Sequence, residues 1–204
     1  MPQNYSDQLK ARRKLKPHEL MVVKVDDHGK KYVEVLLTQN KKALIDYMDY
    51  KVVSKHKWHT HKSSDILYAG TNLYSKEKNR NQTKILMHSL ILGENLIDHK
   101  NGNGLDNRRS NIRACTISQN RANSSKAKGT SSKYKGVFWR DADKKWFAQT
   151  SKNHKRYYIG KFENASDAAK AYDNFARKLY GDFAKLNFPD FEYCAKAAKK
   201  GGKG

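Results

Sequence analysis

The chain has 204 residues, with 42 Lys or Arg against 20 Asp or Glu, so its formal net charge is +22. The excess is spread over most of the sequence, and a field of this kind attracts phosphate backbones and makes their binding fall steeply with salt. Because only 37% of the residues are hydrophobic, we expect two or three small modules and exclude one large core.

The cysteines and the apolar segments limit the compartment. Cys115 and Cys194 stand alone, with no CxxC pair to hold zinc, so a reducing cytoplasm is expected. The N-terminus lacks the apolar segment of a signal peptide, and the longest apolar stretch, residues 85–92, is too short to span a bilayer. We therefore expect a soluble protein with no membrane partner.

The first region, residues 1–83, is predicted to be mainly β and to support the segment that follows it. From about Leu20 to Ile91, and so beyond this region, the stretches MVVKV, KYVEVLL and ILMHSLIL mostly alternate and are rich in β-branched residues, as strands are. Residues 43–58 fit a helix or a strand, and Trp58 within them is expected in the core. His88 is expected as a hydrogen-bonded polar residue on a half-buried strand.

Three histidines in this region, His56, His59 and His61, are close enough in sequence to suggest a metal cluster. No Cys or carboxylate stands at ligand spacing beside them. A zinc site is therefore the weaker interpretation of this segment.

The stretch IDHKNGNGLDNRRSNIRACTISQN, residues 97–120, places an acid and a base side by side. Asp98 offers a carboxylate oxygen for a hard cation, His99 can accept a proton near neutral pH, and Asn120 offers a second, uncharged oxygen. Adjacent residues on a regular strand point to opposite faces, so Asp98 and His99 can serve one site only if the strand ends or bulges there. The alternatives are a solvated turn at DNRRSN and an ordinary surface pair of Asp98 and His99.

A helix is predicted over residues 116–127. Thr116 is a suitable N-cap, Gln119 completes a capping box, and Gly129 supplies a stop. The segment therefore has the order strand, strand, helix. Residues 126–132 are small, polar and basic, which is typical of a linker that stays mobile or lies along DNA.

A second module is predicted over residues 133–189, followed by a basic tail, residues 190–204. YKGVFWR, KWFAQTS and KRYYIGKF are three strand candidates separated by turn residues. An amphipathic helix follows, with Asn164 as its N-cap and Gly181 as its stop. The residues expected in the core of this module are Trp146, Phe162, Tyr172 and Phe175.

Residues 84–125, which carry MHSLILG, IDHKNGNGLDNRRSNIR and QNRAN, resemble the HNH nuclease family, in particular homing endonucleases of phages and bacteria. The resemblance implies a ββα-metal fold in the cytoplasm of a bacterium or a phage-infected host. It implies that His99 is the general base and that Asp98 is a ligand of one divalent cation. Asn111 would brace the loop and orient His99, and Asn120 would complete the cation site from the helix.

This chain has Asn120 where many members of that family have His. An Asp carboxylate with an Asn carbonyl is an all-oxygen set, which favours Mg²⁺ or Mn²⁺. Around the same loop and helix, we expect phosphate contacts from Arg108, Arg109, Arg113 and Arg121. For Asn123, on the helix, we weigh a DNA contact against a structural hydrogen bond and favour the latter.

Residues 133–189 resemble the AP2 DNA-binding domain, through YKGVFWR, the pair Lys145 and Trp146, RYYIGKF, ASDAAKAYD and LNFP. The resemblance implies a three-stranded antiparallel sheet that lies in the major groove, with one helix packed behind it. Tyr158 stands where plant members have Trp, so their target sequence does not transfer. The residues expected to contact DNA are Lys135, Trp139, Arg140, Gln149, Arg156 and Tyr158.

The sequence thus predicts an α+β protein that is a site-directed, metal-dependent DNA endonuclease of the HNH homing type, acting on double-stranded DNA. One active site per chain predicts a nick by a monomer, and a double-strand break would need a dimer or two events. The alternative is a DNA-binding transcriptional regulator that keeps the HNH motif as a scaffold. An RNA-binding protein fits the charge, but the AP2 resemblance speaks against it.

Overall fold

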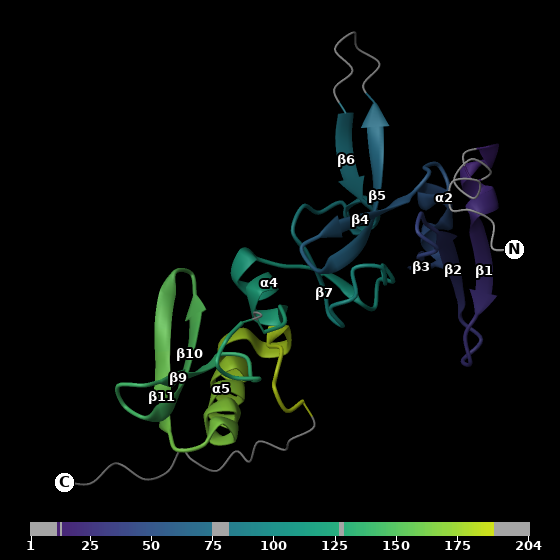
Figure 1. Cartoon of the computed structure of the whole chain (residues 1–204). Coiled ribbons are helices and arrows are strands. Elements are labelled where there is room, and N and C mark those ends of the chain that lie inside the picture. The colour runs from purple at the N-terminus through teal and green to yellow at the C-terminus, as the bar shows by residue number, and fades with distance from the viewer. Residues whose placement is uncertain (1–11, 13, 75–81, 127–128, 190–204) are drawn as a thin grey trace, which may run out of the picture. The chain divides into compact units, whose positions relative to one another are not determined.

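The computed structural model describes residues 12, 14–74, 82–126 and 129–189 (Figure 1). The basic tail and part of the expected linker lie outside these residues. The chain divides into two compact units, Met1–Thr116 and Ile117–Gly204, and each combines antiparallel β structure with helices. This mixed α+β composition agrees with the predicted class.

The first unit begins with a three-stranded antiparallel sheet in the order β1-β2-β3. Residues 43–58, which fit either a helix or a strand by sequence, contain both: β3 runs into two short helical turns and then irregular chain. The elements of this part are η1 (Pro17–Leu20), β1 (Met21–Val25), β2 (Lys31–Leu36), β3 (Lys42–Asp46), η2 (Tyr47–Asp49) and α2 (Tyr50–Val53).

A second antiparallel sheet, in the order β4-β5-β6, and a two-stranded hairpin, β7-β8, complete the first unit. Their elements are β4 (His59–Ser63), β5 (Ile66–Tyr74), β6 (Gln82–Leu86), α3 (Met87–Leu92), β7 (Ile97–His99) and β8 (Ile112–Ala114).

The strand predicted for ILMHSLIL is wrong in its second half, which is helix α3. Strand β6 ends at Leu86, and Gly93 closes the helix in the left-handed region, with φ 73°. Its N–H donates to the carbonyl of Ser89 at 2.8 Å. His88 therefore lies on a helix and not on a half-buried strand. Only glycine takes this C-terminal position without strain, so MHSLILG also fits a short helix.

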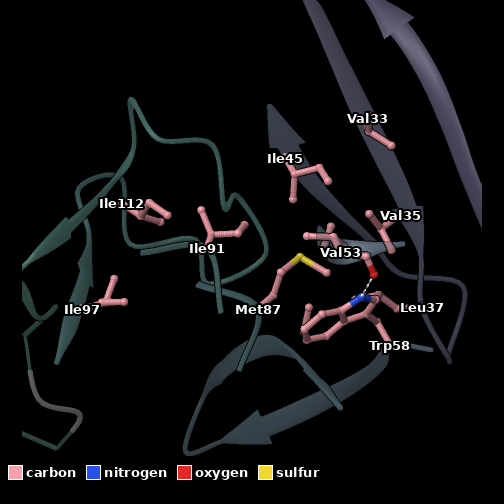
Figure 2. Close-up of a cluster of buried hydrophobic side chains, with 12 residues drawn as sticks. Val33, Val35, Leu37, Ile45, Val53, Trp58, Met87, Ile91, Ile97 and Ile112 are labelled. Atoms are coloured by element: carbon pink, nitrogen blue, oxygen red, sulfur yellow. Dashed lines mark hydrogen bonds between the residues drawn. The ribbon is translucent and has the colours of Figure 1, made fainter. Parts of the chain in front are cut away.

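The core of the first unit connects its two larger sheets with the hairpin (Figure 2). Val33 and Val35 alternate inward from β2, and Trp58 is 1% exposed, as expected for a core residue. The indole N–H of Trp58 donates to the carbonyl of Val53 at 2.9 Å, so its polar edge is satisfied inside the core. Ile97 and Ile112 join the same cluster and fix the hairpin to the rest of the unit.

The second unit contains the three predicted strands and the predicted long helix. The sheet has the order β11-β10-β9 and is antiparallel, and α5 packs against it. Tyr172 lies in this core, with Trp146 and Phe162 partly buried against it, while Phe175 is half-buried against the ring of Tyr157. The elements are α4 (Ile117–Asn123), β9 (Val137–Arg140), β10 (Lys145–Lys152), β11 (Lys155–Phe162), α5 (Ala165–Tyr180) and η3 (Gly181–Phe183).

Helix α4 is shorter than the predicted helix over 116–127 and does not continue toward Gly129. The carbonyls at its C-terminal end are occupied by other partners. The ammonium group of Lys135 donates to the carbonyls of Arg121, Ala122 and Ser124, the last at 2.7 Å. A cation at this end also stabilises the helix dipole, so the stop comes from tertiary contact and not from a glycine.

Two further contacts determine how the chain surrounds α5. Gly136 has φ 73°, and a Cβ there would lie 2.1 Å from the ring of Tyr172, so only glycine fits. The carboxylate of Asp173 is fully buried and accepts hydrogen bonds from the backbone N–H groups of Asn187 and Phe188, at 2.9 and 2.8 Å. The segment after the helix is thereby fastened to it.

Candidate functional site

The expected acid and base lie at the end of strand β7. In the hairpin register Asp98 is opposite Arg113 and His99 is opposite Ile112. The strand ends at His99, whose carbonyl accepts the N–H of Gly102 at 2.8 Å, so the condition that the sequence set for a shared site is met. Asp98 and His99 are 3% and 6% exposed, which makes them buried polar residues and not a surface pair.

The imidazole of His99 is surrounded by polar and aromatic side chains. Its Nε2 lies 3.3 Å from Oδ1 of Asn107, and the rings of His88 and Tyr68 lie 4.9 and 5.9 Å away between centroids. Burial lowers the pKa of His99, while the hydrogen bond to Oδ1 of Asn107 and the charges of Asp98 and Asp106 oppose the shift. The net decrease keeps the ring neutral near pH 7, which is the form that accepts a proton.

His88 is more strongly affected by the same environment. Burial, followed by the neighbouring His99, lowers the pKa of His88 to about 4. Its Nδ1 atom is buried without a hydrogen-bond partner among the described residues. The hydrogen bond expected for His88 is therefore missing at this nitrogen. The ring is held neutral in the core, beside the candidate base.

Asp98 forms an ion pair inside the unit. The Nη2 and Nε atoms of Arg113 lie 2.7 and 2.9 Å from its Oδ2. The pair is mostly buried, since the Arg113 side chain is 15% exposed. Such a pair holds the carboxylate in one orientation and compensates its charge. The phosphate contact expected of Arg113 stays a prediction. In the structure its guanidinium holds Asp98.

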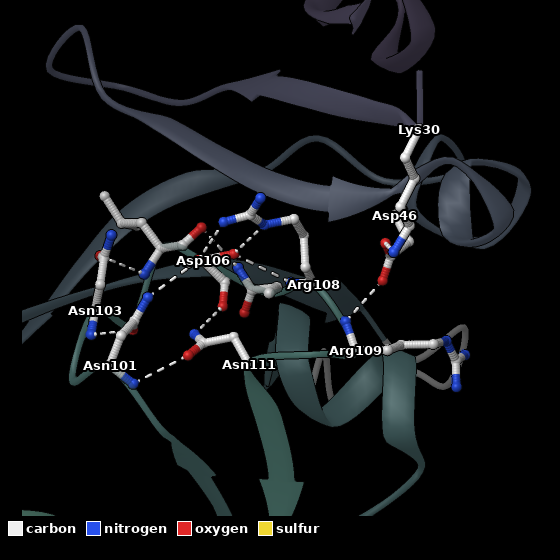
Figure 3. A network of polar contacts seen from close by, with 10 residues as sticks. Lys30, Asp46, Asn101, Asn103, Asp106, Arg108, Arg109 and Asn111 are labelled. Carbon is white, nitrogen blue, oxygen red and sulfur yellow. Dashed lines mark hydrogen bonds and ion pairs between the residues drawn. The ribbon is translucent and has the colours of Figure 1, made fainter. Parts of the chain in front are cut away.

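The loop between β7 and β8 is braced by Asn111 (Figure 3). Its Oδ1 accepts the backbone N–H of Asn101 at 3.0 Å, and its Nδ2 donates to the carbonyl of Asp106 at 2.7 Å. The side chain of Asp106 accepts from Asn101 and from Arg108, the latter with two nitrogens at 2.8 Å. Burial alone raises the pKa of Asp106, but these hydrogen bonds and the charge of Arg108 outweigh it and lower the pKa.

The same loop is anchored to the first sheet. The backbone N–H of Leu44 donates to the carbonyl of Leu105, and the N–H of Asn107 donates back to Leu44, both at 2.8 Å. The loop also passes so close to β5 that a Cβ on Gly104 would lie 2.5 Å from the carbonyl of Leu67. The N-terminal sheets thus position the loop that carries the polar residues.

Arg109 fixes the loop to the helical turns after β3 (Figure 3). Its N–H donates to Asp46 at 2.7 Å, and its guanidinium is paired with Asp49 at 2.7 Å. Both carboxylates are buried, and Asp46 is also paired with Lys30 at 3.0 Å. The phosphate contacts expected of Arg108 and Arg109 stay predictions. In the structure both guanidinium groups are held by carboxylates of their own unit.

Sequence reasoning missed Asn107 and Tyr68 as neighbours of His99. It named His88 but did not place its ring against that of His99. Asn107 is 0% exposed, which is unusual for an amide, yet by sequence it is one more polar residue in DNRRSN. Tyr68 comes from a strand about 30 positions away, and no local pattern connects it to His99. The contact between the loop and β5 brings Tyr68 to His99, and helix α3 brings His88.

The metal site expected from Asp98 and Asn120 is divided between the two units. Asp98 lies in the first, while Asn120 is exposed on α4 in the second, so the pairing stays a prediction. Within the part of the chain that is described, no group of three or more His, Cys, Asp or Glu side chains is arranged to hold a metal ion. The donors present near His99 are carboxylate and amide oxygens, which fit a hard divalent cation in type.

The outer face of the AP2-like sheet gathers most of the side chains expected to read DNA. Arg140, Gln149, Arg156 and Tyr158 line one shallow depression there, together with Phe138, Asp143, Phe147 and Lys161. Tyr158 is 59% exposed, so its ring is accessible from the outer face. Arg140 is paired with Asp143 at 2.9 Å and lies over the ring of Phe147.

The other residues expected to contact DNA are more engaged within the unit. Trp139 donates from its indole N–H to Asp141 at 3.0 Å, and its ring meets that of Trp146 edge-on. Lys135 has its ammonium group on the carbonyls of α4. Asn123 is 9% exposed, while Arg121 is exposed on the same helix. The DNA contacts of these residues stay predictions.

Comparison with known proteins identifies the second unit first: residues 132–182 match the AP2 domain family. The dehydration-responsive element-binding protein 2D of Arabidopsis thaliana is 44% identical over 59 residues, 28% of each chain. An uncharacterized HNH endonuclease of Acanthamoeba polyphaga mimivirus is 31% identical over 150 residues, 73% of this chain and 76% of that protein. The chain belongs to the HNH endonuclease family.

No solved structure matches the chain. Among the residues that the structure describes, none of the helices has the length and apolar character needed to cross a membrane.

Proposed function

We propose that this protein is a metal-dependent DNA endonuclease of the homing type, whose AP2 domain recognises double-stranded DNA. The observation that supports this most directly is the buried, neutral His99 at the end of β7, next to Asp98, in a chain of the HNH family. Burying a polar or charged group costs free energy unless it is hydrogen-bonded or paired, as Asp98 is with Arg113. The arrangement supplies a base and an acid at one strand end.

In this proposal His99 takes a proton from a water molecule as the water attacks the phosphorus in line with the leaving 3′ oxygen. Asn107 orients the imidazole through its contact at 3.3 Å, and Asn111 holds the loop closed around it. Asp98 and Asn120 would hold one divalent cation, Mg²⁺ or Mn²⁺. When bound, such a cation neutralises charge on the scissile phosphate and on the leaving oxygen.

The AP2 domain contributes affinity and sequence preference in this proposal. Arginine and glutamine on the outer face of the sheet can form paired hydrogen bonds with base edges in the major groove. Two modest binding modules on one chain raise the effective concentration of each at the other's site. The nuclease unit would thereby act beside the sequence that the AP2 domain selects.

The test is cleavage of a DNA pool with Mg²⁺, Mn²⁺ or EDTA by the wild type and by His99→Ala at matched DNA occupancy. We expect metal-dependent cuts that fall about 10²- to 10⁴-fold in the variant, the usual contribution of a general base, with binding unchanged. His28→Ala, which removes an exposed imidazole from the same unit, should cut normally. Binding without cuts in wild type and variants, across all metals, would instead identify a DNA-binding regulator that keeps the HNH scaffold.

A further inference from the structure

Helix α4 is physically part of the second unit. Ala122 is 6% exposed and lies in the core cluster of the AP2 fold. Its carbonyl also accepts the backbone N–H of Lys185 at 3.1 Å, and the hydroxyl of Ser118 meets the side chain of Asn153 at 2.8 Å. With the Lys135 ammonium on its last carbonyls, α4 is attached to the AP2 fold at both ends.

This attachment creates a cavity of about 520 Å³ between the C-terminal end of α4, the chain that follows it, and the sheet. Four cationic side chains line it: Arg121, Lys126, Lys135 and Arg156. Serine and threonine residues supply hydroxyl groups around the same space, and no Asp or Glu is among the lining residues that the structure describes. The cavity is therefore basic.

Among the described residues, three of these four cations are not paired with aspartates as the arginines of the first unit are. There, Arg108, Arg109 and Arg113 are each paired with an aspartate. Within the described residues, by contrast, no carboxylate pairs with Arg121, Lys126 or Arg156. Like charges gathered around one space repel each other, and an anionic ligand removes that cost.

The position of the cavity indicates which anion it takes. It shares Phe138, Gln149 and Arg156 with the depression on the outer face of the sheet, so the two are adjacent. A duplex read by that face would bring its phosphates to the mouth of the cavity. We propose that the cavity binds a backbone phosphate of the DNA that the AP2 sheet reads, with Arg121 and Lys126 as its ligands.

This inference deepens the proposed DNA recognition and does not depend on cleavage. It extends the DNA-binding surface to a helix outside the part of the chain that matches the AP2 family, residues 132–182. It also gives α4 two roles, because the same helix carries Asn120.

The test uses the full chain in EDTA, so that no cleavage occurs, and a mixed-sequence duplex whose affinity is measured at several salt concentrations. Arg121→Ala and Lys126→Ala are compared with Lys178→Ala, which removes an exposed charge from α5. Each cavity variant should bind on the order of tenfold more weakly, as expected when one charge-assisted hydrogen bond is removed. The slope of log affinity against log salt should become shallower by about 0.9 for each phosphate that a variant no longer neutralises.

Melting curves of the variants should match the wild type, because neither side chain pairs with a carboxylate that would be left alone. If the cavity variants and Lys178→Ala change affinity and slope equally, the cavity holds no phosphate and the inference is overturned. Inorganic phosphate provides a second test. If phosphate fills the cavity at a concentration that does not displace DNA, the cavity binds a free anion and the inference is also overturned. Failure of the wild type to bind DNA at all would instead reject the proposed function.

Discussion

Asp98 and Arg113 show how much of the candidate site depends on charge pairing at single residues. The carboxylate is 3% exposed, and a buried charge of this kind is tolerated only with a partner. The sequence places Asp98 and His99 side by side, but it does not predict that the strand ends at His99. It also does not predict that Arg113, directly across the hairpin, pairs with the carboxylate. The register of the two strands cannot be predicted from the sequence of either strand alone.

A substitution at Asn107 tests how much the buried polar contacts around His99 contribute to the stability of the first unit. Asn107→Ala removes the Oδ1 atom that meets His99 and the Nδ2 group that donates to the Leu105 carbonyl at 3.2 Å. Unsatisfied buried groups should then destabilise the first unit by about 1–3 kcal/mol. Urea unfolding measures this change, with Asn95→Ala, at an exposed amide of the same unit, as the control. Equal stability of both variants would show that the contact with His99 contributes nothing.

His88 should make the stability of the first unit depend on pH. The folded-state pKa of about 4 lies below the ordinary value of 6.5, so the neutral ring is favoured by folding. The stability it contributes is present above pH 6.5 and is lost as pH falls toward 4, because the unfolded chain binds the proton first. The shift corresponds to about 3 kcal/mol at most.

The measurement is urea unfolding across this pH range for the wild type and for His88→Gln, which removes the titrating group. The wild type should lose stability more steeply toward acid than the variant does. Parallel curves for the two proteins would mean that His88 does not stay neutral in the folded unit. The sequence predicts a half-buried, hydrogen-bonded His88, but it does not predict this pH dependence, which comes from the packing of α3.

At the scale of elements, the strands and the long helix of the second unit are predictable from sequence because their patterns are local. Strands β9 to β11 alternate and are separated by turn residues, and α5 has one apolar face and a glycine stop. The short helices are harder to predict. The few residues of α3 cannot distinguish a helical period from an alternating one, and the end of α4 depends on Lys135, beyond the helix in sequence.

Gly136, just before β9, is a position where the fold has no room for a side chain. Gly136→Ala would place a Cβ 2.1 Å from the ring of Tyr172, in addition to backbone strain at φ 73°. Gly129→Ala is a matched control, because Gly129 has φ 74° and open space around it. The first variant should unfold at lower temperature and cost about 2 kcal/mol more than the second, the part due to overpacking. Similar melting temperatures would show that Tyr172 moves aside without cost.

At the scale of the whole molecule, the sequence predicts two or three small modules from its charge and its low apolar content, and the structure has two compact units. One candidate active site per chain leads to a further expectation. On supercoiled plasmid DNA, nicked circles should accumulate before linear molecules, since each encounter cuts one strand. Direct conversion to linear DNA, with a rate that rises as the square of protein concentration, would contradict a monomer and indicate a dimer.

The attachment of α4 to the AP2 fold also bears on how such proteins can be recombined. A gene fusion that exchanges the recognition half at the basic segment 126–132 would leave α4 behind, without Lys135 on its carbonyls and with Ala122 exposed to water. A junction at Thr116 keeps every one of these interactions inside the transferred piece. On the proposed function, the segment that must be transferred whole to change the DNA target is therefore longer than the AP2 domain. It includes the helix that carries Asn120.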